Sequence, residues 1–373
     1  MKLKHYNNLE ILRFLAAFSI IILHYPTFTL ASSVIVNDMQ NSEHPFSYVF
    51  APFAVFGGYG VQFFWLLSGF IFFSQYINKI KNKETTGYRF FINRFSRLYP
   101  LHIVTALIMF ILLNIYNSYI YPTNSGLFRF GADIEDLLLH IFFASDWDTS
   151  RGYSLNGPIW SVSLEILAYL SFFLIARFLP KMIIPVSLIA TILLFTLFPN
   201  DLLYQVFLYF YAGGLIYLLS DFASRKLSRS IINISVIVTL LFSAIGLFGI
   251  YLLSLDIFLG NSSPTRSAGL FLSVVFVFLI WGAALSPQLE GKPGKVAQFL
   301  GNLTYASYLI HYPIMTLIII YCELTNTHIP VESELFLAFW ILIVFIPSYF
   351  VYKYFERPVQ DKIRSASYKQ RKP

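Results

Sequence analysis

Apolar runs of about 20 residues recur along the whole chain. A helix of that length crosses the hydrocarbon core of a bilayer. Soluble domains carry about 25% charged residues, whereas this chain of 373 residues has 12% charged and 57% hydrophobic residues. We therefore expect an all-α polytopic membrane protein with about ten transmembrane helices, surrounded by lipid and without a soluble domain. The expected spans are 9–28, 54–76, 97–118, 158–177, 182–199, 202–220, 231–254, 267–285, 299–321 and 335–355.

The distribution of basic residues predicts an orientation. With a cytoplasmic N-terminus, all but three of the 26 Lys and Arg residues fall on the cytoplasmic side or at its margin, the exceptions being Arg129, Arg151 and Arg266. We expect an integral protein of the cell (inner or plasma) membrane with both termini cytoplasmic. The net charge of +7 then reflects topology, so no nucleic-acid partner is expected.

The chain is expected to form one membrane domain over residues 1–373. Because no signal-peptide cleavage pattern precedes the first apolar run, that run is interpreted as a retained span. The longest segment between spans, 119–157, is interpreted as an outer loop with a short helix at 133–143, and a second outer loop covers 28–53. The single cysteine, Cys322, excludes an internal disulfide, and no metal site is predicted.

Arg13 and His24 interrupt the first apolar run. An ionisable side chain in a membrane helix costs free energy and usually serves a function. Eleven positions correspond to three helical turns plus about 20°, so on one continuous helix both side chains would share a face, about 16 Å apart along the axis. Alternatively, Arg13 reaches the headgroups and His24 bonds a neighbouring helix.

Arg94 and Arg97 lie three residues apart at the cytoplasmic end of the third span. Guanidinium groups bind phosphate with paired hydrogen bonds, so this pair is a candidate phosphate site. The alternative is an anchor for lipid headgroups, which also accounts for the nearby lysines.

Glu165 is expected about two turns into the fourth span, at the depth of His24. Its carboxylate could orient the imidazole or form a structural ion pair. Trp160, at the start of the same span, is interpreted as a residue of the interfacial aromatic belt.

Other polar residues within spans are assigned structural roles first. Ser68, with Gly69, favours close helix packing, and Gln62 could donate a hydrogen bond into a site. Glu10 is interpreted as the ion-pair partner of Arg13. His311 precedes Pro313, which has no backbone N–H, and we expect His311 to satisfy the backbone group that this proline exposes.

These segments together resemble the acyltransferase-3 family of integral membrane acyltransferases. The resemblance covers nearly the whole chain, in the order "LEILRFLAAFSIIILHY", "FFWLLSGF", "NRFSRLYP", "IWSVSLEILAYL", "FYAGGLIY", "GNLTYASYLIHYPI" and "YFERPV". Relatives often have two adjacent acidic residues where this chain has Leu164 and Glu165, which leaves Glu165 as the only carboxylate expected there.

The resemblance implies transfer of an acyl group, commonly acetyl from acetyl-CoA or another acyl-CoA, to a carbohydrate hydroxyl at the outer face. CoA phosphates on Arg94, Arg97 and Arg13 would place the thioester near His24. His24 would then be a general base assisted by Glu165, or a nucleophile that carries the acyl group. A transporter or flippase of a glycan or lipid-linked sugar, with Arg13, His24 and Glu165 as a relay, is the alternative. The acceptor, the acyl group and the oligomeric state are left open.

Overall fold

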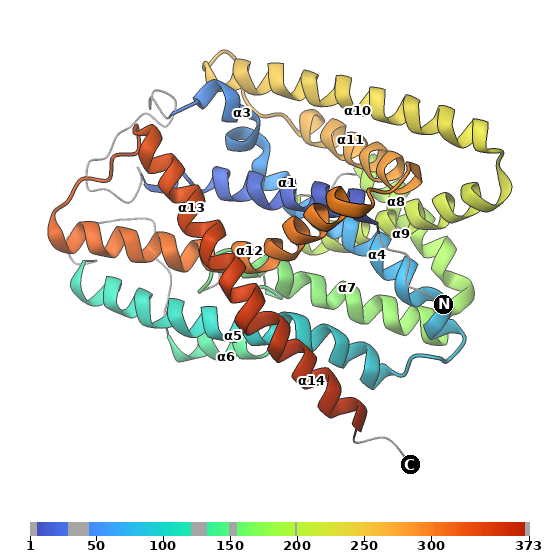
Figure 1. Ribbon diagram of the computed structural model, residues 1–373, viewed down its shortest axis with the longest axis horizontal. Coiled ribbons are helices and arrows are strands. Elements are labelled where there is room, and N and C mark those ends of the chain that lie inside the picture. Colours follow the sequence, from blue (N-terminus) through green and yellow to red (C-terminus); the bar gives the residue numbers. More distant parts are fainter. Residues whose placement is uncertain (1–5, 29–44, 121–132, 149–154, 198–199, 370–373) are drawn as a thin grey trace. The chain divides into compact units, whose positions relative to one another are not determined.

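The computed structural model describes residues 6–28, 45–120, 133–148, 155–197 and 200–369. All regular structure in these ranges is helical (Figure 1). The helices are α1 (Asn7–Leu23), α3 (Ser47–Phe56), α4 (Gly60–Lys81), α5 (Gly87–Tyr119), α6 (Ile134–Ile141), α7 (Ile159–Phe178), α8 (Ile183–Leu197), α9 (Leu202–Lys226), α10 (Arg229–Phe258), α11 (Arg266–Leu285), α12 (Gly291–Thr325), α13 (Glu334–Val351) and α14 (Arg357–Lys369). Short 3₁₀ helices cover Gly57–Tyr59 (η1) and Pro180–Met182 (η3), and a π-helix covers Tyr352–Glu356 (η4).

Nine helical stretches in the described ranges are long and apolar enough to cross a membrane. They overlap the second to the tenth of the expected spans, which confirms an all-α polytopic membrane protein. The short helix expected at 133–143 is confirmed as α6, where Asp133 accepts a hydrogen bond from the Asp136 backbone N–H at 2.8 Å. Most of the segment expected as the second outer loop, 28–53, lies outside the described residues.

The first expected span, 9–28, is wrong at its C-terminal end. Helix α1 has 17 residues and ends at Leu23, and His24 to Pro26 form a turn. A residue before proline is pushed out of the helical conformation, which explains why the helix cannot continue through Tyr25. The argument that Arg13 and His24 share a helical face required one continuous helix, and therefore does not apply.

The chain divides into two compact units. Unit 1 comprises Met1–Leu23, Tyr48–Thr85 and Leu167–Gly301, and unit 2 comprises His24–Ser47, Thr86–Ile166 and Asn302–Pro373.

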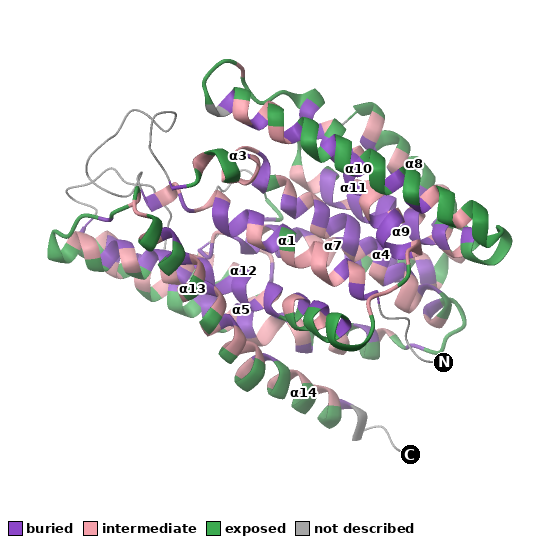
Figure 2. Ribbon diagram, turned by 45° about the horizontal axis from the view of Figure 1, so that its top comes forward, coloured by how far each residue is buried: buried purple, intermediate pink, exposed green. Residues whose placement is uncertain are grey.

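The centre of unit 1 is the pair of helices α4 and α9, which are side by side in Figure 1 and largely buried in Figure 2. A Cβ atom on Gly69 would collide with the Phe210 carbonyl oxygen, and one on Gly213 would collide with the Leu66 carbonyl oxygen. The two backbones can approach this closely only because both positions are glycine. This confirms the close helix packing expected next to Ser68.

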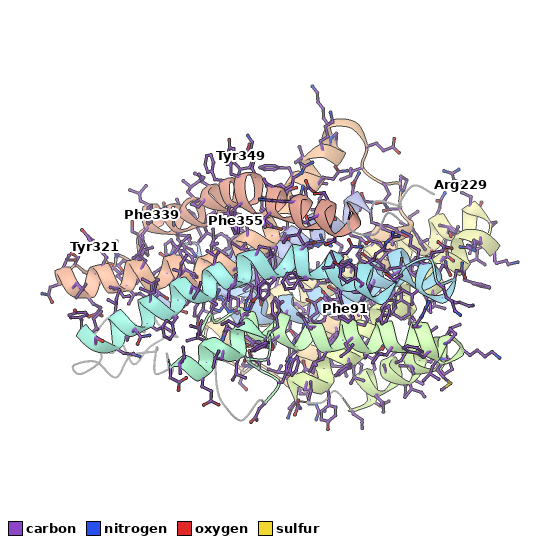
Figure 3. All side chains as sticks on the ribbon, turned by 90° about the horizontal axis from the view of Figure 1, so that it is seen from below. Phe91, Arg229, Tyr321, Phe339, Tyr349 and Phe355 are labelled. Carbon is purple, nitrogen blue, oxygen red and sulfur yellow. The ribbon has the colours of Figure 1, made fainter. Side chains whose placement is uncertain are left out.

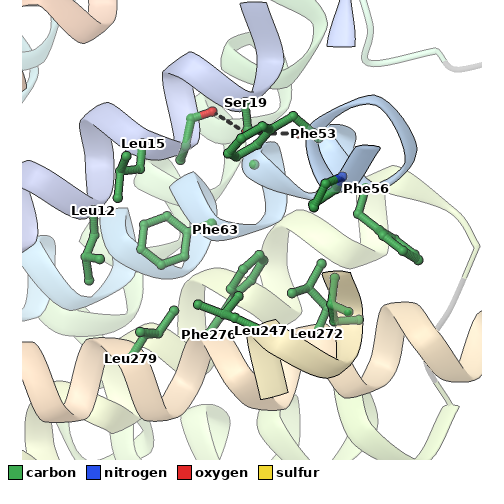
Figure 4. A pocket seen from close by; sticks show the side chains of 15 residues that line it. Leu12, Leu15, Ser19, Phe53, Phe56, Phe63, Leu247, Leu272, Phe276 and Leu279 are labelled. Carbon is green, nitrogen blue, oxygen red and sulfur yellow. Dashed lines mark hydrogen bonds between the residues drawn. The ribbon is translucent and has the colours of Figure 1, made fainter. Parts of the chain in front are cut away.

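A half-open apolar cavity of ≈ 350 Å³ lies in unit 1 between α1, α3, α4, α10 and α11 (Figure 4). Ser19 has the one hydroxyl among the lining side chains, and it donates to the Ala16 carbonyl oxygen at 2.8 Å. Because the other lining side chains are hydrocarbon, this cavity is unsuited to holding a phosphate or a sugar.

Unit 2 is organised around α5, which packs against α6, η4 and α14. Large aromatic side chains project outward from its helices, among them Phe91, Tyr321 and Phe339 (Figure 3). Such apolar side chains on the outside of long apolar helices are expected where a protein faces lipid.

Candidate active site

The structure brings His24 into direct contact with α12 inside unit 2. His24 Nδ1 lies 3.3 Å from His311 Nε2, and the two ring centroids are 5.1 Å apart. The Tyr312 ring stands at 90° to both imidazoles, with centroids 5.4 Å from His24 and 5.7 Å from His311. His311 is fully buried, whereas His24 is half-buried. The site is therefore a pair of imidazoles, of which only His24 reaches a partly accessible surface.

The backbone role expected for His311 is filled by a different residue. Pro313 removes the hydrogen bond that the Leu309 carbonyl would accept within α12. Asn156 Nδ2 donates to that carbonyl at 3.1 Å, while His311 Nδ1 donates to the Ser307 carbonyl at 3.1 Å. The expectation that His311 satisfies the gap at Pro313 is wrong, because a buried amide from the segment before α7 reaches it first. The second ring nitrogen of His311 faces His24 instead.

The segment that leads into α7 docks onto α12 close to the two imidazoles. Gly157 lies against the Tyr312 ring, and a Cβ atom there would overlap the ring. Ser161 Oγ and the Tyr308 hydroxyl are 2.8 Å apart, so the first turn of α7 is hydrogen-bonded to α12. These contacts hold Tyr312 in place against His24.

Glu165 is close enough to Tyr308 for their charges to interact. Its charge and that of Asp146 both influence the Tyr308 hydroxyl, and the Tyr308 ring centroid is 6.1 Å from that of His311. Asp146 is buried because residues 143–147 fold against α7, where Ser163 Oγ donates to the Phe143 carbonyl at 2.8 Å. The expectation that Glu165 is the only carboxylate there is therefore wrong, since Asp146, in the segment before α7, supplies a second one.

Helix α6 reaches α5 through a second pair of histidines. His102 Nε2 donates to the His140 carbonyl at 2.7 Å, and His140 Nδ1 donates to the Asp136 carbonyl at 2.8 Å. Burial lowers the pKa of His140 to about 4, so this imidazole is neutral at physiological pH. These hydrogen bonds fix α6 to α5.

Arg94 and Arg97 are half-buried on α5 and are joined there by residues near the C-terminus. The charge of Arg97 acts on the buried Glu356 carboxylate. Arg364 donates from Nε to Ser96 Oγ and from Nη2 to the Asn93 carbonyl, both at 3.1 Å. The arginine pair is thus part of a larger charged cluster, with one carboxylate inside it.

The remaining predicted site residues have the following positions. Arg13 and Glu10 lie in unit 1 and form the predicted ion pair, with Nη1 2.9 Å from Oε2. Gln62 Nε2 donates to Gln205 Oε1 at 3.0 Å, so it links α4 to α9. Ser68 is half-buried on α4, and Trp160 is half-buried in the first turn of α7. A metal-binding group of three His, Cys, Asp or Glu side chains does not occur within the described residues.

Sequence reasoning missed Asn156, Gly157, Tyr308, Tyr312 and Asp146. One signal was available. Pro313 leaves the Leu309 carbonyl without its usual backbone partner, and a buried carbonyl needs a hydrogen-bond donor. The Asn156 side chain in "NGP", directly before the fourth expected span, was a candidate donor. Nothing in the hydropathy pattern indicates that Tyr312 packs on His24 or that Asp146 turns inward.

Comparison with known proteins supports the same conclusion as the motifs. The sequence profile described as "Acyltransferase domain" matches residues 6–352. The chain is also similar to "Acyltransferase MdmB" of Streptomyces mycarofaciens, with 34% identity over 125 residues, which cover 34% of this chain and 30% of that protein. No solved structure matches the chain. Because the profile extends over nearly all of the described helices, the chain belongs to the acyltransferase-3 family of acyltransferase domains.

Proposed function

We propose that the protein is a membrane O-acyltransferase that moves an acyl group, in the first instance acetyl, from cytoplasmic acetyl-CoA to a hydroxyl of a carbohydrate at the outer face of the cell membrane. The observation that carries the proposal is the half-buried His24 imidazole, which contacts a second imidazole and an aromatic ring. The chain that holds this imidazole belongs to a family of acyltransferases. A positioned imidazole of this kind is suited to general base catalysis.

In the proposed reaction, His24 takes the proton of the acceptor hydroxyl as its oxygen attacks the thioester carbonyl. The carbon–sulfur bond breaks, the new ester forms, and the CoA thiolate takes the proton from His24. In the covalent variant, His24 attacks the thioester carbonyl, the carbon–sulfur bond breaks, and the acyl group is left on the imidazole. The acceptor oxygen then attacks this acyl group, the acyl–nitrogen bond breaks, and the hydroxyl proton goes to the CoA thiolate. Both routes release one CoA thiol for each ester formed.

For the donor, we propose that Arg94, Arg97 and Arg13 contact CoA phosphates. Charge-assisted hydrogen bonds from partly buried guanidinium groups are well suited to this. Arg97 shares its surroundings with Glu356, and Arg13 is paired with Glu10, so each can exchange a carboxylate neighbour for phosphate oxygens. The basic residues near both ends of the chain support cytoplasmic termini, which would place each of these arginines on the side where acetyl-CoA occurs.

The proposal is tested with purified protein in proteoliposomes that contain acetyl-CoA labelled in the acetyl group. We expect thiol release that depends on added acceptor glycan, together with transfer of label to that glycan. Mass and ester analysis of surface glycans from cells with and without the gene identifies the acceptor. Movement of a glycan across the bilayer without consumption of acetyl-CoA would instead establish a transporter.

A further inference from the structure

Both ring nitrogens of His311 have a hydrogen-bond partner, and neither partner in these two bonds is a carboxylate or another charged side chain. Nδ1 lies 3.1 Å from the Ser307 carbonyl oxygen, and Nε2 lies 3.3 Å from His24 Nδ1. The Ser307 carbonyl is also the regular α-helical acceptor for the backbone N–H of His311, so the ring bond is an additional one. Because α12 remains hydrogen-bonded without this contact, the ring bond serves mainly to orient the imidazole.

The hydrogen-bond partners of the two imidazoles determine which ring nitrogens carry protons. A carbonyl oxygen can only accept, so His311 Nδ1 must carry a proton. A second proton would place a charged imidazolium at a fully buried position, which is costly, so His311 Nε2 carries a lone pair. His24 Nδ1 must then be the donor in the contact between the rings, and the lone pair of neutral His24 is on Nε2.

We propose that His311 is a positioning residue that holds His24 in the Nδ1–H tautomer, so that Nε2 is the basic nitrogen. This rests on the proposed function, in which His24 takes the acceptor proton. When Nε2 takes that proton, Nδ1–H continues to donate to His311 Nε2, and the charge on His24 faces a chain of aligned hydrogen bonds that ends at the Ser307 carbonyl. The role is that of the carboxylate in a catalytic triad, performed here by a neutral imidazole.

The packing around the pair limits rotation of His24. Tyr312 stands at 90° to both rings, and Gly157 leaves room for Tyr312. A ring flip of His24 would turn Nδ1 away from His311 Nε2 and break the described contact between the rings. Glu165 and Asp146 act on Tyr308, which is the next aromatic neighbour of His311.

Two substitutions at His311 distinguish a role in orienting His24 from a role in packing alone. In His311→Gln, the side-chain amide oxygen can occupy the place of Nε2 and still accept from His24. In His311→Leu, a side chain of comparable size has no acceptor. We expect His311→Leu to lower kcat by about 10²–10⁴-fold with little change in KM for acetyl-CoA, because a wrong tautomer affects the chemical step. His311→Gln should recover most of this loss, and the exposed His328→Leu serves as control.

The independent readout is the ¹⁵N spectrum of protein labelled at histidine, with the His24 signals assigned by their loss in His24→Gln. We expect a protonated Nδ1 and an unprotonated Nε2 at His24, and loss of this preference in His311→Leu. A proton on Nε2 of His24, or equal kcat in the wild type and His311→Leu, would overturn the inference. If His24→Gln is as active as the wild type, the proposed function fails, whereas the spectrum still decides the tautomer.

Discussion

The α4–α9 pair of unit 1 and the histidine pair of unit 2 use similar sequence signals for different purposes. In both regions, small and polar residues interrupt apolar helices. In unit 1, Gly69 and Gly213 bring two backbones together, and Gln62 bonds Gln205. In unit 2, Gly157 makes room for Tyr312, and the polar atoms converge on ring nitrogens that can exchange protons. A small residue in a membrane helix is thus informative only once its neighbour is known.

The largest expected effect is on folding, in unit 1. Gly213→Ala places a Cβ atom against the Leu66 carbonyl, which is backbone and cannot move aside as a side chain can. We expect a cost above the roughly 1–3 kcal/mol typical of overpacked cores, seen as loss of folded protein and of thermal stability. Gly249→Ala on α10 is the matched control, because a Cβ atom there meets nothing within 4 Å. Equal stability of the two variants would contradict the close packing.

The next largest effect concerns donor binding. Arg94→Ala and Arg97→Ala would each remove a proposed charge-assisted phosphate contact, of a kind worth about 1.5–3 kcal/mol. We expect KM for acetyl-CoA to rise by about 10–100-fold in both variants. Thermal stability should change little in Arg94→Ala and fall in Arg97→Ala, which also loses the charge beside the buried Glu356 carboxylate. Lys81→Ala, an exposed basic residue at the end of α4, is the control. Should all three variants behave alike at equal expression, the arginine pair is only an anchor.

A smaller effect is expected at Gly157, the counterpart of Gly213 in unit 2. In Gly157→Ala, the added Cβ atom would contact the end of the Tyr312 side chain, which can shift. The protein should fold, whereas kcat should fall by about tenfold because the displaced ring no longer packs on His24; this corresponds to about 1.4 kcal/mol. Parallel measurement of kcat and melting temperature checks this. A loss of stability as large as that of Gly213→Ala, with kcat unchanged in the folded fraction, would remove the distinction between the two regions.

The smallest effect is a pH dependence of α6. The pKa of His140 is lowered by burial from 6.5 to about 4, so the folded state binds fewer protons than the unfolded state. Its stabilising contribution is complete above pH 6.5 and is lost as the pH falls toward about 4. Hydrogen exchange of Leu137 to Ile141, corrected for intrinsic rates, should show loss of protection over this interval. The dependence should weaken in His140→Gln, and a pH-independent wild type would contradict the assignment.

Hydropathy was sufficient to predict most of the fold. The apolar runs predicted the second to the tenth spans because a membrane helix is defined by a local property, its length of apolar sequence. The end of α1 was missed, although Pro26 marked it, since five further residues looked apolar enough to continue the span.

The site could be predicted only in part. His24 was identified because an ionisable group in an apolar run is costly, which is again a local property. The contact between His24 and His311 joins residues 287 positions apart and depends on how two helices pack. Asp146 was missed for the same reason, because only the folded loop turns its carboxylate inward.

We propose that His24 is the base for acyl transfer, and the turnover of purified His24→Gln decides this. Gln keeps hydrogen bonding and approximate size but cannot accept a proton at neutral pH. We predict that acetyl-CoA is still bound, that the melting temperature stays within a few degrees of the wild type, and that acceptor-dependent thiol release falls by about 10²–10⁴-fold. Thiol release by His24→Gln at the wild-type rate would show that His24 is not the base.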